Sequence, residues 1–131
     1  MDAMEAREGD GVAWFRMNHA IIGGAGSLSD MPLSSVLGPA DWTHGITRPL
    51  QDVVADPNPN LTVQLFRRPE GPWVGIRAEA RWRPVGGLGV GSGVLLDVNG
   101  EIGRVSMLVI LVPFPPQAKP RPAAGLAPVA N

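Results

Sequence analysis

The 131-residue chain contains no cysteine and only two histidines. The absence of cysteine excludes disulfides, thiolate metal sites and a cysteine nucleophile. His19 and His44 are too far apart in the sequence to indicate a metal site. We therefore expect neither a metal nor a cofactor.

The chain also has almost no excess of one charge over the other, and it has no long apolar run. The formal net charge of −1 gives nucleic acid and anionic membrane surfaces no general electrostatic attraction. The longest apolar run, residues 105–112, is interrupted by Ser106 and is far shorter than the roughly 20 residues that span a bilayer. The first eleven residues are acidic and polar and contain no secretory signal. These features predict a cytoplasmic protein with no nucleic-acid or membrane partner.

Glycine and proline are abundant instead, with 17 and 14 residues. So many helix breakers argue against a helical bundle and favour a strand-rich fold. The composition divides the chain into a disordered acidic arm (1–11), one folded domain (12–113) and a disordered Pro/Ala-rich tail (114–131).

The residue patterns predict five strands and one short helix. The strands are expected at residues 12–22, 61–68, 73–83, 90–98 and 101–112. Residues 73–83 alternate most cleanly between apolar and charged side chains, and Asn99-Gly100 favours a tight hairpin turn. The helix is expected after an Asp30 N-cap, with Gly38-Pro39 kinking or ending it. This order predicts an α+β fold in which the helix covers one face of an antiparallel sheet.

Three segments, taken together, resemble a known enzyme family. They are ADWTHGITRPL, NPNLTVQLFRRPEGPWVGIRAEARW and DVNGEIGRVSMLVILVP. The chain resembles the C-terminal module of double-hotdog, thioesterase-II-like acyl-CoA thioesterases over residues 12–113. The resemblance implies a single hotdog, with a long antiparallel five-stranded sheet wrapped around one central helix. It also implies hydrolysis of a fatty acyl-CoA thioester to free acid and CoA.

The same resemblance implies a partner. Family members usually carry two such modules, whereas this chain has one, which leaves an edge strand with unpaired backbone groups. A second copy related by a two-fold axis, or a second hotdog module of a longer parent, would satisfy that edge. We expect a homodimer or such a module pair.

The resemblance places the catalytic base at Asp41, where the carboxylate would activate a water. Asn58, Asn60 and Thr62 are alternative candidates for the second polar group. The family's third group, a Gln, falls on Met107 or Leu108, and neither side chain orients a water or polarises a carbonyl. Without the resemblance, a helix or turn cap is the simpler role for Asp41.

Five further residues are substrate-binding candidates, and two readings of the function stay open. The candidates are Trp42, His44, Gly45, Met107 and Arg67. Trp42 and Met107 would line an apolar acyl pocket between helix and sheet. Arg67 would meet the CoA phosphates, or else lie on a solvated face beside glutamates. The chain is therefore a thioester hydrolase or, alternatively, a catalytically degenerate module that binds acyl groups or serves as a dimerisation partner.

Overall fold

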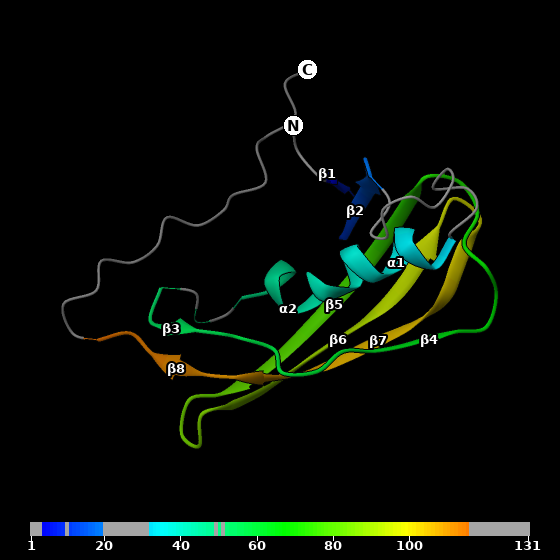
Figure 1. The fold of residues 1–131 in the computed structure, drawn as a ribbon. Coiled ribbons are helices and arrows are strands. Elements are labelled where there is room, and N and C mark those ends of the chain that lie inside the picture. Colours follow the sequence, from blue (N-terminus) through cyan, green and yellow to red (C-terminus); the bar gives the residue numbers. More distant parts are fainter. Residues whose placement is uncertain (1–3, 10, 20–31, 49, 51, 116–131) are drawn as a thin grey trace.

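A curved antiparallel sheet and two short helices on one of its faces make up the fold (Figure 1). The computed structural model describes residues 4–9, 11–19, 32–48, 50 and 52–115. The sheet has six strands in the order β1-β2-β5-β6-β7-β4. These are β1 (Met4–Gly9), β2 (Val12–Met17), β5 (Trp73–Arg83), β6 (Leu88–Asp97), β7 (Gly100–Ile110) and β4 (Thr62–Leu65). A separate two-stranded ribbon pairs β3 (Val54–Ala55) with β8 (Val112–Pro113).

The three long strands β5, β6 and β7 form the centre of the sheet. Each is antiparallel to the next, and the strand predicted at residues 73–83 is confirmed at both ends. The predicted β6–β7 hairpin is present, but its two turn residues are Val98 and Asn99. Gly100, at a φ of 110° that favours glycine, begins β7, so the predicted Asn99-Gly100 turn is displaced by one residue. A register shift opposite Leu95/Leu96 leaves Ile102 as an extra residue in β7, which is a β-bulge.

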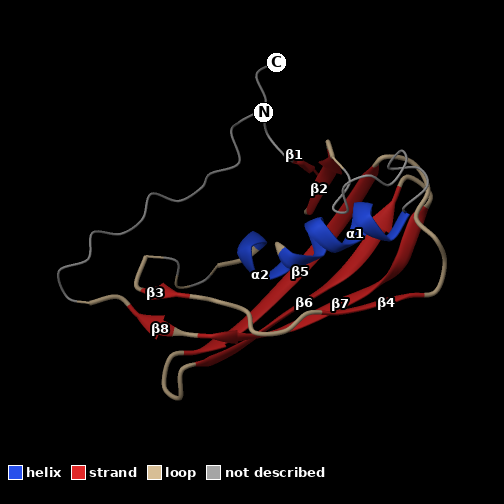
Figure 2. Ribbon diagram, viewed as in Figure 1, coloured by secondary structure: helices blue, strands red, loops and turns tan. Residues whose placement is uncertain are grey.

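The prediction of a single hotdog, with five strands around one central helix, is wrong. The sheet has six strands, and the helical segment consists of α1 (Pro32–Asp41) and α2 (Thr43–Ile46), so no long central helix exists in the described residues. Figure 2 shows both helices as short elements beside a much larger sheet. Trp42 occupies the turn between the two helices and interrupts the helical path.

The sixth strand arises from residues predicted to be a disordered arm. Residues 4–9 form β1, which pairs with all of β2 from Met4 opposite Met17 to Gly9 opposite Val12. Gly11, at a φ of 71°, lies in the connecting turn. The half-buried Met4 and Ala6 pack against the core and give this strand its apolar face.

Helix α1 packs on the sheet through Val36 and Ala40, which are completely buried. Leu33 and Leu37, which share the predicted helical pattern, are exposed. Pro39 lies inside the helix and does not end it, so the helix continues to Asp41. The predicted N-cap, Asp30, lies outside the described residues, as do residues 20–22 of the first predicted strand and residues 116–131 of the predicted tail. Within the described ranges, neither helix has the length and apolarity to cross a bilayer.

Candidate functional site

The junction between α1 and α2 presents several of the predicted site residues. Thr43 is fully buried, and its Oγ1 donates a hydrogen bond to the Ala40 carbonyl at 2.7 Å. The Trp42 backbone N–H donates to the Pro39 carbonyl at 2.9 Å. These bonds hold the chain in a tight turn, which leaves Asp41 and Trp42 on the outside at the end of α1.

A cavity of about 300 Å³ opens at this junction. It is lined by Asp41, Trp42, His44, Gly45, Arg48 and Asp56. Asn58 donates from Nδ2 to Oδ1 of Asp41 at 2.8 Å, so this predicted polar residue lies at the same place. The structure thus brings together five of the nine predicted site residues, although the lining is more polar than the apolar pocket expected from the sequence.

His44 connects the cavity to the sheet. Its Nδ1 lies 3.2 Å from Sδ of Met107, and its Nε2 lies 3.8 Å from Oδ2 of Asp56. Met107 is 2% exposed and faces the helices, so of the two candidates for the missing amide it is the one that points toward the site. A Cβ at Gly91 would lie 3.1 Å from Cβ of His44 and 3.2 Å from Cγ of Met107. The absence of a side chain at Gly91 therefore allows α2 to approach the sheet this closely.

Arg48 and Asp56 are site residues that the sequence did not reveal. Arg48 Nε donates to Asp56 Oδ2 at 2.9 Å, and Arg48 Nη2 bonds the other carboxylate oxygen. Asp56 is buried, so this bidentate pair fixes the segment between β3 and β4 against the end of α2. The two residues are eight positions apart and belong to no recognisable motif. Only the packing of the chain brings them together.

The arrangement offers acid–base and positioning chemistry. Asp41 uses Oδ1 for Asn58, and among the described residues nothing bonds its Oδ2. His44 and the Arg48–Asp56 pair lie in the wall of the same cavity. In the part of the chain that the structure describes, no group of three or more His, Asp or Glu side chains is placed to hold a metal ion.

Asn60 and Thr62 lie outside the cavity lining. Asn60 Oδ1 accepts a hydrogen bond from the backbone N–H of Leu108 at 2.8 Å, which ties the entry of β4 to β7. Thr62 is exposed and lies opposite Ser106, on the sheet face that the helices do not cover. Of the three alternatives for the second polar group, only Asn58 reaches Asp41.

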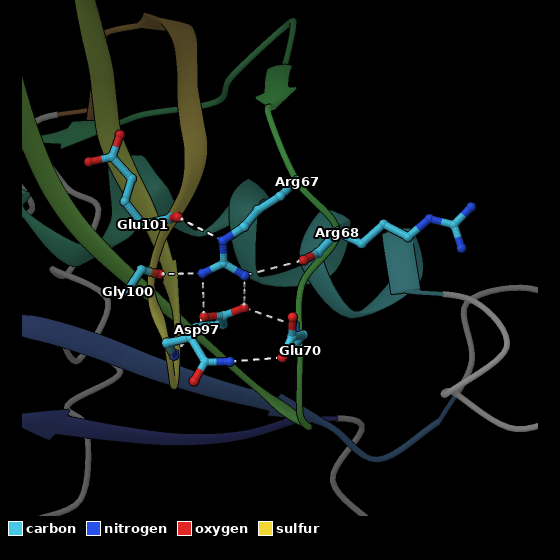
Figure 3. A network of polar contacts seen from close by, with 7 residues as sticks. Arg67, Arg68, Glu70, Asp97, Gly100 and Glu101 are labelled. Carbon is cyan, nitrogen blue, oxygen red and sulfur yellow. Dashed lines mark hydrogen bonds and ion pairs between the residues drawn. The ribbon is translucent and has the colours of Figure 1, made fainter.

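Arg67, the predicted contact for CoA phosphates, has a different role (Figure 3). Nη1 and Nη2 donate to the two carboxylate oxygens of Asp97 at 2.6 and 2.7 Å. The remaining donors reach the carbonyls of Glu101 at 3.2 Å, Gly100 at 3.3 Å and Arg68 at 3.4 Å. All five guanidinium N–H groups are therefore used within the fold. The pairing of these donors within the fold leaves none of them free for the phosphate contact that the resemblance implies for Arg67.

Asp97 is the buried centre of this network. Besides Arg67, its carboxylate accepts the backbone N–H groups of Glu70 and Asn99, each at 2.8 Å. The hydrogen bond from Arg67 lowers the pKa of Asp97 from 3.8 to about 2, because it stabilises the charged form more than burial destabilises it. The network ties the β4–β5 connection to the β6–β7 hairpin and is structural.

Comparison with known proteins provides no family for this chain. No protein-family model matches it, and no curated protein matches it. Among solved structures, the fold is similar to a mutant of the hypothetical protein SAV0944 from Staphylococcus aureus, with a TM-score of 0.49 and 10% sequence identity. The match covers 85% of this chain and 94% of that one. The function is therefore inferred from the site itself.

Proposed function

We propose that this protein hydrolyses fatty acyl-CoA thioesters with Asp41 as the general base. The observation that carries the proposal is the Asn58–Asp41 hydrogen bond of 2.8 Å at the cavity of about 300 Å³. It joins the two positions that the resemblance to acyl-CoA thioesterases assigns to the base and to its polar partner. Trp42 and His44 supply further walls of the same cavity.

The bond from Asn58 gives Asp41 an asymmetric role. Its Oδ1 is held by the amide, so Oδ2 accepts a hydrogen bond from a water. As the water oxygen attacks the thioester carbonyl carbon, its proton passes to Oδ2. The C–S bond then breaks, and the CoA thiolate leaves and takes up a proton. The products are the free acid and CoA.

The site lacks one group that would assist this reaction. Met107 occupies the position of the family's Gln, and a thioether donates no hydrogen bond to the carbonyl oxygen. Loss of one such donor lowers acyl-transfer rates by about 10²- to 10³-fold. We therefore expect slow turnover.

Release of free CoA from a panel of fatty acyl-CoAs tests the proposal. Asp41→Asn keeps the side-chain size and removes the base, so the rate of release should fall at least about 100-fold. Asp52→Asn is the matched control, because Asp52 is exposed and is not part of the cavity lining. A native chain that releases no CoA, or an Asp41→Asn variant with the native rate, would overturn the hydrolase proposal.

The alternative is a degenerate module that binds acyl groups without turning them over, and Met107 is the observation that favours it. The buried thioether contacts His44 where an amide would assist chemistry. Binding of an acyl-CoA by the native chain, without CoA release, would support this alternative. Absence of both binding and release would reject both readings.

A homodimer formed at the exposed half of β5 belongs to the same proposal. β2 pairs only with residues 73–76 of β5, so residues 77–83 have a strand neighbour on one side only among the described residues. The Arg77 and Arg81 carbonyls lie 3.1 and 3.3 Å from the Cβ positions of Gly93 and Gly89 on β6. The backbone groups of alternate residues, such as Ala80, therefore point away from β6 toward the free edge. A second copy would pair with this edge across a two-fold axis.

Ala80→Pro tests this edge contact. Proline removes the N–H that points outward and is tolerated on a free edge. The variant should lose half of the native mass in sedimentation while its circular dichroism is unchanged. An unchanged mass would place any dimer contact elsewhere.

We also propose a cytoplasmic location, which the absence of cysteine supports because the fold needs no oxidising compartment. Recovery of the protein in a periplasmic or secreted fraction of its host would reject this proposal.

A further inference from the structure

The sheet face opposite the helices is divided into a polar half and an apolar half. Cross-strand neighbours on this outer face can be read from the register of β5, β6 and β7. One half carries Glu79, Ser92 and Ser106 in one row and Arg77, Val94 and Arg104 in the next. The other half carries two rows in which β6 and β7 contribute only large aliphatic side chains.

The aliphatic residues of that half form what we call the outer apolar patch: Leu88, Val90, Leu108 and Ile110. Leu88 lies opposite Ile110, and Val90 lies opposite Leu108. Their exposed fractions are 52%, 49%, 39% and 38%, so each is only partly covered by its neighbours. The solvent-exposed face of an antiparallel sheet normally carries polar residues, as the other half of this face does. A contiguous apolar patch of this kind marks an interaction surface.

We propose that the outer apolar patch binds the same patch of a second copy, sheet against sheet. The patch is self-complementary, because β6 and β7 each contribute two aliphatic residues at matching heights. A two-fold axis parallel to the strands and between β6 and β7 would place Leu88 on the second copy's Ile110, and Val90 on its Leu108. Twisted antiparallel sheets pack face to face through such aliphatic surfaces.

The charges at the rim agree with this axis. Arg81 and Arg83 flank the patch on β5, opposite Val90 and Leu88. With this axis, β5 of one copy lies over the β4 side of the second copy. Arg81 then faces the neutral Asn60, which is next to Leu108 in the same row. The arginines of the two copies are thus kept apart. An axis perpendicular to the strands would stack β5 on β5 and bring like charges together, so it is disfavoured.

The size of the face predicts weak association. The two apolar rows span four strands about 4.8 Å apart and about four residues at about 3.3 Å each, which gives about 250 Å² per copy. A standard interface buries about 800 Å² per partner. We therefore expect weak association that increases with protein concentration.

Sedimentation of the full chain over a range of concentrations tests the proposal. The double substitution Val90→Lys with Leu108→Lys places four ammonium groups in the paired patches. It should abolish the part of the mass that rises with protein concentration, whether or not the β5 edge contact forms. The matched control is Ser92→Lys with Ser106→Lys, on the same two strands in the polar half, which should leave the mass unchanged. Circular dichroism of each variant establishes that the sheet is retained.

Two results would overturn the proposal. One is a native mass that is independent of concentration and equal in the patch and control variants. The other is patch-dependent binding to anionic lipid vesicles by a chain that shows no self-association. Both readouts are independent of CoA release, so failure of the hydrolase proposal leaves this one standing.

Discussion

The role of an individual arginine in this protein depends on which of its hydrogen-bond donors are already paired, as well as on its charge. Arg67 lies in a run of basic residues, yet its five donors all end on Asp97 and on three backbone carbonyls. Arg48 is likewise committed to Asp56. A cation that is paired within the fold is poorly suited to hold a phosphate. The sequence shows that a residue is an arginine, but it does not show which acceptors its guanidinium will bond in the fold.

Asp97→Asn should destabilise the fold by about 2 kcal/mol at pH 7, because the half-buried Arg67 and the backbone N–H groups of Glu70 and Asn99 lose the buried charged acceptor that they share. The pKa of Asp97 is about 2 in the folded state against 3.8 in the unfolded chain. A lowered folded-state pKa contributes stability above pH 3.8, about 2 kcal/mol here, which is lost as the pH falls toward 2.

Urea unfolding of the native and Asp97→Asn chains at several pH values measures this contribution. The difference in the free energy of unfolding should be largest near neutral pH and should shrink below pH 4. Asp52→Asn, an exposed control, should change it by less than about 0.5 kcal/mol. Equal stability of the native and Asp97→Asn chains at pH 7 would contradict the role assigned to Asp97.

Met107→Gln should raise the rate of CoA release about tenfold or more, because it supplies the amide donor that the site lacks. Leu108→Gln is the matched control. Its side chain lies on the opposite face of the sheet and is 39% exposed, so the same substitution should leave the rate unchanged. Steady-state CoA release by the two variants decides between them. A Met107→Gln chain that is folded and no faster than the native one would contradict the proposed site.

At the scale of the elements, close contact between backbones sets the geometry. The β-bulge at Ile102 brings β7 against β4, and a Cβ at Gly103 would lie 2.1 Å from the backbone oxygen of Gln64. No side chain fits there unless β4 moves. Gly91 similarly leaves space on the sheet for His44 of α2.

Gly103→Ala should therefore cost about 3 kcal/mol and loosen β4. Thermal unfolding measures the cost, and amide hydrogen exchange at residues 62–65 shows whether β4 is the part released. Gly9→Ala is the control, because its Cβ would meet nothing within 4 Å. Similar losses of stability for both substitutions would mean that strand propensity, and not the close approach of Gly103 to Gln64, causes the loss.

The elements differ in how far their sequences predict them. Residues 73–83 alternate because one face is buried and the other is solvated, and that pattern alone predicts β5. The acidic composition of residues 4–9 indicates disorder and so conceals β1. The Asp10-Gly11 dipeptide that follows in the sequence is nevertheless a hairpin signal. Helix α1 faces the sheet with Val36 and Ala40, which no single-segment pattern distinguishes from Leu33 and Leu37.

At the scale of the whole molecule, the site depends on contacts between distant segments. Asp41 meets Asn58, which is one of three polar candidates, with Asn60 and Thr62, that the resemblance left open. Asp56 reaches His44 and Arg48 only because the segment between β3 and β4 folds back against α2. Such long-range packing leaves no local signature in the sequence. The two proposed self-contacts, at the β5 edge and at the outer apolar patch, use different surfaces of the sheet, so each can be tested separately.

A chain that ends after Leu111 should lose order around the cavity while the main sheet persists. It lacks Val112 and Pro113, which pair with Ala55 and Val54, and it lacks the Phe114 N–H that donates to Val53 at 3.1 Å. Amide exchange at residues 53–58 should accelerate. A chain that ends after Pro115 retains the β3–β8 pairing and the Phe114 N–H bond, and is the reference for the comparison. Native exchange rates in the shorter chain would mean that this pairing holds nothing in place.

The small β3–β8 ribbon has a mechanical consequence. It fastens the residues just before Asp56 and Asn58 to the point where the polypeptide leaves its last long strand. A fusion or a bound partner near residue 115 would therefore act on the segment of Asp56 and Asn58 and, through Asn58, on the carboxylate of Asp41. The β3–β8 pairing connects the end of the last long strand directly to the wall of the cavity.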